Sequence, residues 1–86
     1  MNVELVHALQ SELDKTGTCW WQRDGDGVRM TRYLLGYILV FQRYHETGWE
    51  QVSWKSTLTE EAALQHLLFS RCAFVLDELV YLRQAA

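Results

Sequence analysis

The sequence contains no proline and only two cysteines, and it has no long apolar run. A transmembrane helix needs roughly 18 consecutive apolar residues, so membrane-spanning proteins are excluded, and the amphipathic N-terminus is unlike a signal peptide. Two cysteines cannot build a disulfide-rich scaffold, so Cys19 and Cys72 are expected to be reduced thiols in a cytoplasmic protein. A basic surplus is also missing, because eleven acidic residues outnumber eight basic ones.

Core-forming side chains are abundant instead. Of the 86 residues, 49% are hydrophobic and 13% are aromatic, which is too apolar for a disordered chain. A chain of this length has material for one hydrophobic core only. We therefore expect a single domain over residues 1–86.

The first half of the chain predicts a helix followed by a sheet. Leu9 and Leu13 belong to an apolar helical stripe over residues 2–15. Asn2 is the expected N-cap of this helix, and Gly17 is the expected residue at which it ends. Alternating side chains and glycine-containing turns then predict strands at 18–23, 28–35, 37–45 and 49–55, with turns at 24–27 and 46–48.

The last third predicts one long helix. Thr57 and Glu60 are spaced as a capping box, and no residue from there to Gln84 breaks a helix. The expected fold class is α+β, with an N-terminal helix, a three- to four-stranded antiparallel meander sheet, and a long C-terminal helix packed on the sheet.

Metal-ligating residue types are present without the spacing of a metal site. Asp24 and Asp26 resemble the start of a calcium loop, but Leu35 occupies the position of the final glutamate ligand. No pair of histidines or cysteines has the close spacing of a zinc site. A site assembled in the fold from Cys19, Cys72 and a histidine is a minor alternative. We expect no metal and no cofactor.

Catalytic motifs are not found either. The sequence has no nucleophile elbow and no phosphate-binding glycine-rich loop. Cys72 lies in an apolar helical run, which is typical of a buried inert thiol. Neighbouring acids such as Asp77 and Glu78 diverge by about 100° on a helix and cannot share a proton. We expect no catalytic residues and no enzyme activity.

Acidic residues at two predicted turns give the first candidate binding surface. Consecutive antiparallel hairpins can bring alternate turns to one edge of a sheet, where their charge would steer a cationic partner. An exposed tryptophan beside them would serve as an anchor. Ordinary solvated turns are the competing interpretation, because turns favour aspartate and glycine. The predicted partner-binding residues are Asp24, Asp26, Glu46, Trp49 and Glu50.

Leu67, Phe74 and Tyr81 give the second candidate surface, because they recur every seven residues along the predicted long helix. They form an apolar stripe with polar flanks, separate from the main apolar face. Such a stripe is typical of an oligomer contact, and a homodimer is one expectation. A contact within the domain is equally compatible with it.

A mixture of arginines and aromatic residues in the sheet region leaves a third interpretation open. Aromatic side chains beside arginines can stack exposed bases and hold phosphates. Acidic residues in the same region and the acidic balance of the chain weigh against a nucleic-acid surface.

The stretch from Tyr37 to Glu50 (YILVFQRYHETGWE), followed by STLTEEAALQHLL from Ser56 to Leu68, resembles small bacterial immunity proteins of polymorphic and contact-dependent toxin systems. The resemblance lies in a strand–hairpin–strand pattern before a helix, which in that family often begins T-x-E-E-A and here reads T-E-E-A from Thr59 to Ala62, and it covers residues 37–68. It implies a non-enzymatic, cytoplasmic inhibitor that binds one toxin, often a basic nuclease. It assigns no functional residue.

Three functions are therefore predicted, in this order. The first is a protein-binding inhibitor of the immunity type, which suits the acidic charge and the surplus of aromatic residues. The second is a homo-oligomeric structural or adaptor module that assembles through the C-terminal helix. The third is a nucleic-acid-binding sheet. The expected partner is another protein, and no membrane is involved.

Overall fold

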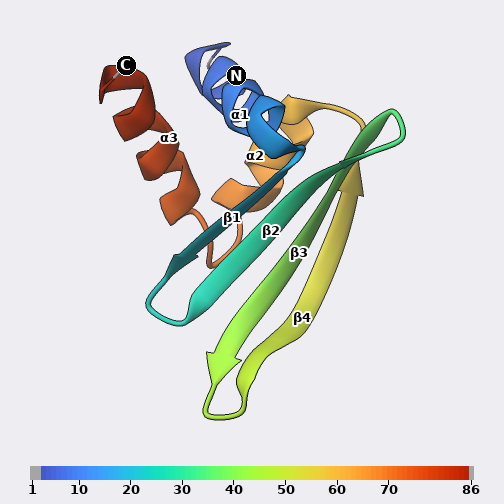
Figure 1. The fold of residues 1–86 in the computed structure, drawn as a ribbon, viewed down its shortest axis with the longest axis vertical. Coiled ribbons are helices and arrows are strands. Elements are labelled where there is room, and N and C mark those ends of the chain that lie inside the picture. Colours follow the sequence, from blue (N-terminus) through green and yellow to red (C-terminus); the bar gives the residue numbers. More distant parts are fainter. Residues whose placement is uncertain (1–2, 86) are drawn as a thin grey trace.

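Four strands form one antiparallel sheet in the order β1-β2-β3-β4, so each strand pairs with its neighbour in sequence (Figure 1). This arrangement confirms the predicted meander and its fourth strand. The computed structural model describes residues 3–85. Its elements are α1 (Val3–Thr16), β1 (Thr18–Arg23), β2 (Asp26–Tyr33), β3 (Gly36–His45), β4 (Gly48–Thr57), α2 (Glu60–Leu68) and α3 (Phe74–Ala85).

The first helix ends as its sequence predicts. Gly17 has a φ of 81°, and its backbone N–H donates to the carbonyl oxygen of Leu13 at 2.7 Å. Glycine takes this left-handed conformation without a steric penalty, so α1 stops there and the chain turns into β1. The predicted N-cap, Asn2, lies outside the described residues.

The C-terminal region differs from its prediction, because the expected long helix is two short ones. α2 ends at Leu68, and α3 begins at Phe74. Between them the Ser70 hydroxyl donates to the carbonyl oxygen of Leu67 at 2.8 Å and accepts from the N–H of Cys72 at 3.0 Å. A serine that bonds nearby backbone in this way competes with the helical hydrogen bonds. The helix therefore breaks without glycine or proline.

The N-cap of α2 is also displaced from its predicted position. Thr59 caps the helix, and its side-chain oxygen accepts from the N–H of Ala62 at 3.2 Å. Thr57, the expected cap, is instead buried, with its hydroxyl donating to the carbonyl oxygen of Thr59 at 3.2 Å. The threonine nearer to the helix satisfies its first turn, and the other one fixes the preceding loop.

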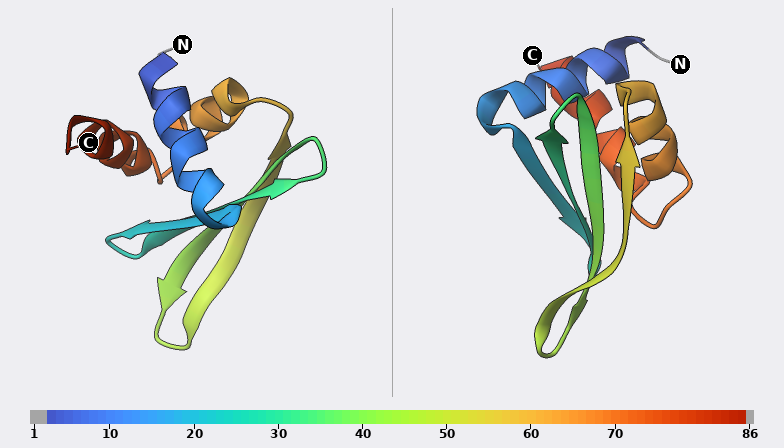
Figure 2. Two further views of the ribbon diagram at one scale, coloured as in Figure 1. Left: turned by 45° about the horizontal axis from the view of Figure 1, so that its top comes forward. Right: turned by 90° about the vertical axis from the view of Figure 1, so that its right-hand side faces the viewer.

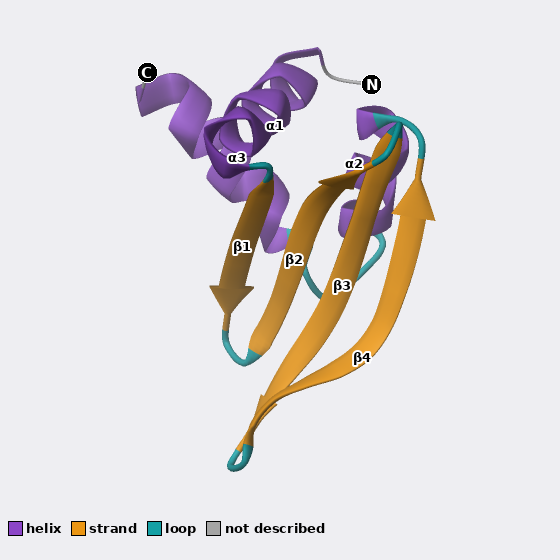
Figure 3. Cartoon of the chain, turned by 45° about the vertical axis from the view of Figure 1, so that its right-hand side comes forward, coloured by secondary structure: helices purple, strands orange, loops and turns teal. Residues whose placement is uncertain are grey.

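The hydrophobic core lies between the helices and one face of the sheet. Side chains alternate between the two faces of a strand, and the buried apolar residues of β2 and β3 follow this alternation: Val28 and Met30 on β2, and Leu39 and Phe41 on β3. The helices stand behind the sheet in Figure 3, and the β3–β4 hairpin extends away from them. The largest fully buried side chains are Leu9, Leu13, Val28, Met30, Leu39, Leu64, Leu67, Cys72, Val75 and Leu79.

Polar contacts tie the helices to this face of the sheet and to one another. The Arg32 guanidinium on β2 lies 2.7 Å from Asp14 of α1, and Arg23 on β1 lies 3.5 Å from Glu78 of α3. The Gln10 amide donates to Glu60 at 2.6 Å, and this bond is the main reason why the pKa of Glu60 lies below its usual value. No helix in residues 3–85 is long and apolar enough to cross a membrane.

Candidate protein-binding surface

None of the helices in residues 3–85 packs on the second face of the sheet, which we call the open face, and Figure 2 shows the same one-sided arrangement from two further directions. Its residues alternate with buried ones, so their side chains point away from the helices. The face is rich in aromatic groups: Tyr44 is 57% exposed and Trp54 is 59% exposed. Its main members are Trp20 of β1, Arg29 of β2, Val40 and Tyr44 of β3, and Trp49 and Trp54 of β4.

Three of these aromatic rings form a cluster at the hairpin end of the open face. The ring centroids of Trp20 and Trp49 are 4.9 Å apart in an edge-to-face arrangement, and those of Tyr44 and Trp49 are 5.4 Å apart. The Arg29 guanidinium lies 5.7 Å from the centroid of Trp20. Edge-to-face pairs and a cation over a ring are both favourable, so the cluster is a preformed unit.

Gly27 explains how two tryptophans from opposite edge strands meet. A Cβ atom at this position would collide with the Trp20 ring and would lie 3.0 Å from the Trp49 ring. Gly27 is on β2, between the two rings, and only glycine leaves room for both. The sequence pattern predicts Gly27 as a turn residue, whereas the structure places it in a strand beneath the cluster.

A shallow hollow of about 200 Å³ adjoins the cluster. Its wall includes Tyr44 and Trp49, together with Gln22 and the backbone at Gly25. The N–H of Tyr44 donates to the carbonyl oxygen of Gly25 at 2.8 Å, which joins the β1–β2 turn to β3. The cluster therefore lies on paired strands, beside a turn that is hydrogen-bonded to the sheet.

The predicted acidic residues do lie at one end of the sheet, because both hairpin turns point the same way (Figure 1). Their charge is partly compensated: Asp26 lies 3.8 Å from Arg43, and Glu50 lies 2.7 Å from His45. Asp24 and Glu46, at the tips of the turns, make no ion pair among the described residues. The fifth predicted residue, Trp49, is part of the aromatic cluster.

The predicted oligomer stripe is not a continuous surface. Leu67 belongs to the core and is fully buried, and Phe74 is half-buried with the Arg23 guanidinium 5.0 Å from its ring centroid. Tyr81, on α3, is 70% exposed. The seven-residue spacing does not define one helical face, because Leu67 is on α2 whereas Phe74 and Tyr81 are on α3.

Most basic side chains of the strands face the helices. Arg23, Arg32 and Arg43 lie there beside acidic partners, and Lys55 lines a cleft against α2. Arg29 is the one basic residue that the described strands place on the open face. A nucleic-acid surface needs several cations along its path, so this distribution does not favour the nucleic-acid interpretation.

Of the two cysteine side chains, Cys72 is buried and Cys19 is half-buried. Burial raises the pKa of both cysteine thiols to about 11, so they are protonated at neutral pH and poor nucleophiles. No group of three histidine, cysteine or acidic side chains that could hold a metal is found within the described residues.

Trp20, Tyr44 and Trp54 belong to the aromatic and arginine mixture of the sheet region, but the sequence does not predict them as partner-binding residues. Strand alternation could have placed Trp20 and Tyr44 on one face, since Trp20 lies between Cys19 and Trp21, and Tyr44 is an odd number of positions from the buried Phe41. Trp54 has polar neighbours, and its place on this face follows from its pairing with Val40. Compared with protein-family models, curated proteins and solved structures, the chain shows no match.

Proposed function

We propose that this chain is a non-enzymatic protein-binding module that uses the open face as its contact surface. The observation that carries this proposal is the exposed aromatic cluster of Trp20, Tyr44 and Trp49 on a sheet face without helices. Tryptophan and tyrosine are the side chains most enriched at the energetic centres of protein interfaces.

The make-up of the open face supports a protein partner over a nucleic acid. It combines aromatic rings, the aliphatic side chains of Ile38 and Val40, and one cation, Arg29, with glutamine, serine and threonine side chains at several other positions. Interface centres are poor in charge and rich in aromatic groups and arginine, whereas phosphate-binding surfaces are strongly basic.

More specifically, we propose a cytoplasmic inhibitor of the immunity type, whose partner is a basic toxin. The net charge of −3 and the turn residues Asp24 and Glu46, next to the cluster, support this assignment. Negative charge at the edge of an aromatic contact surface would speed the approach of a cationic protein, and the aromatic rings would slow its dissociation.

A capture experiment tests the module and its surface together. Immobilised protein is incubated with an extract of its host, and bound proteins are identified by mass spectrometry. Trp49→Ala and Trp54→Ala should each weaken capture by about thirtyfold, since a central aromatic anchor contributes about 2 kcal/mol. Leu34→Ser, 88% exposed in the β2–β3 turn at the other end of the sheet, is the control. Equal capture by all variants would contradict the proposal.

Charge reversal tests the role of the acidic turns. Asp24→Lys with Glu46→Lys should slow association with the captured partner markedly at low salt and much less at high salt, because screening removes long-range steering. These two residues are chosen because Asp26 and Glu50 already have basic neighbours. Glu61→Lys with Asp77→Lys makes the same charge change on the helices and serves as the control. An unchanged association rate at low salt would remove the acidic-edge idea.

Self-association is the second candidate, and the exposed side chain of Tyr81 on α3 favours it together with its exposed neighbour Val80. A homo-oligomer would bury these side chains against a second copy. Sedimentation at micromolar protein concentration separates the two functions. A folded, strictly monomeric protein would leave the first proposal alone.

A further inference from the structure

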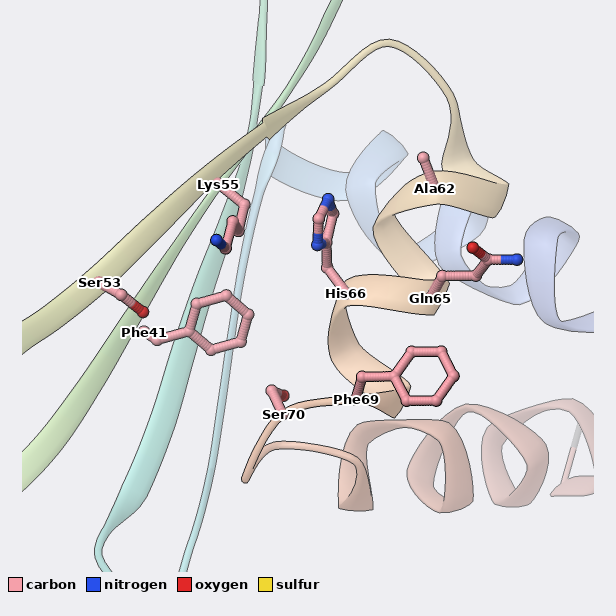
Figure 4. A pocket seen from close by; sticks show the side chains of 8 residues that line it. All are labelled: Phe41, Ser53, Lys55, Ala62, Gln65, His66, Phe69 and Ser70. Carbon is pink, nitrogen blue, oxygen red and sulfur yellow. The ribbon is translucent and has the colours of Figure 1, made fainter.

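A cleft of about 420 Å³ separates α2 from strands β3 and β4, on the side of the sheet opposite the open face (Figure 4). Its volume is in the lower range of pockets that hold small organic ligands. The sheet contributes Phe41, Ser53 and Lys55, whereas Ala62, Gln65, His66, Phe69 and Ser70 come from α2 and the segment that follows it.

The cleft exists because β4 is polar where it faces the helices. Lys55 pairs in register with Leu39, and Ser53 pairs with Phe41. Both β3 residues are buried, and side chains directly opposite each other point to the same face of a sheet. Apolar residues at these two β4 positions would continue the core under α2. A serine and a lysine leave the space between β4 and α2 unfilled.

The lining residues that can carry charge are cationic or neutral. Lys55 and His66 are the titratable side chains of the lining, and no carboxylate belongs to it. Figure 4 shows the Lys55 and Phe41 side chains on the sheet side of the gap, and the His66 imidazole on the helix side. Lys55 makes no ion pair among the described residues. None of the eleven acidic residues lines this cleft, so the charge of its lining favours an anion over a cation.

We propose that this cleft binds a small organic carboxylate with an apolar body. The carboxylate pairs with the Lys55 ammonium and lies within reach of the His66 imidazole, and the apolar part packs on the Phe41 ring. A single lysine is a point charge that suits a monoanion, whereas phosphate groups are more often held by arginine forks or several donors. Because the Phe41 ring lines the cleft, we expect the ligand to carry an apolar group as well as its carboxylate.

Benzoate is a suitable probe, and benzamide is its uncharged counterpart of nearly equal shape. We expect benzoate to shift the backbone amide NMR signals of the cleft residues with a Kd of about 1 mM, typical of a small ligand held by one ion pair and one aromatic contact. Benzamide should bind at least tenfold more weakly, since it lacks the charge that Lys55 recognises.

Two lysine variants make the test specific. Lys55→Gln should weaken benzoate binding at least tenfold, while Lys15→Gln, which removes the only other lysine and the same charge, should leave it unchanged. Lys15 is at the end of α1 and pairs with Glu12. Equal shifts from benzoate and benzamide, shifts that do not saturate, or full binding by Lys55→Gln would each overturn the proposal. The benzamide comparison uses the unchanged protein, so it holds even if a variant misfolds.

Discussion

Replacing Leu79 with alanine is expected to lower the free energy of unfolding by about 2–5 kcal/mol, the usual cost of truncating a leucine in a packed core. Leu79 is fully buried on α3, close to Val75, which is also fully buried. α3 packs mainly against α1, and Leu79 belongs to the same buried cluster as Leu9 and Leu13 of that helix. The cavity left by the substitution would weaken the contact that holds α3 to the domain.

Urea unfolding followed by circular dichroism measures this loss. Leu82→Ala is the matched control, because it makes the same chemical change on the same helix at a side chain that is 38% exposed. We expect Leu82→Ala to cost less than about 1 kcal/mol, since little buried surface is removed and alanine is the best helix former. Equal losses in the two variants would mean that α3 is not anchored by its buried face.

The first half of the fold could be predicted from sequence because its information is local. The stop at Gly17 and the glycines of the turns mark where the chain changes direction, and alternation marks each strand. Strand ends differ from prediction by only a few residues. For example, β2 begins at Asp26 and not at Val28, because Asp24 and Gly25 alone suffice for the turn.

The break between α2 and α3 could not be predicted from local propensity. Residues 69–73 contain no glycine or proline, and the apolar pattern continues across them. The break is favourable in the folded protein because it lets three side chains pack in one core: Leu67 of α2, Val75 of α3, and Cys72 from the segment between them. Packing of this kind routinely overrides the preference of a segment for one long helix.

The candidate site was predictable in its position but not in its composition. The topology of a meander brings the turns of Asp24 and Glu46 to one end, and Trp49 was expected there as an anchor. The contact of Trp49 with Trp20 joins strands at opposite edges of the sheet, so no spacing in the sequence encodes it directly. The cleft at Lys55 depends likewise on where α2 crosses β4.

Gly36→Ala is the second change with a large expected effect. A Cβ atom at Gly36 would collide with the backbone carbonyl oxygen of Thr57, where β4 passes beside the start of β3. The backbone of Thr57 cannot rotate away from the added Cβ as a flexible side chain could. The pairing of Tyr37 with Thr57 therefore has to open or shift. We expect a loss of about 3 kcal/mol in the free energy of unfolding, at the upper end of the cost of overpacking.

Gly27→Ala provides the comparison, because the three atoms nearest to its added Cβ belong to the rings of Trp20 and Trp49 and not to backbone. Those rings can rotate toward solvent, so the cost in stability should be nearer to 1 kcal/mol, while the near-ultraviolet circular dichroism of the tryptophans should change strongly. Gly36→Ala should show the reverse: a large loss of stability and, in the fraction that remains folded, an unchanged aromatic signal. A Gly36→Ala protein as stable as the unchanged chain would mean that β4 does not pass so close to Gly36.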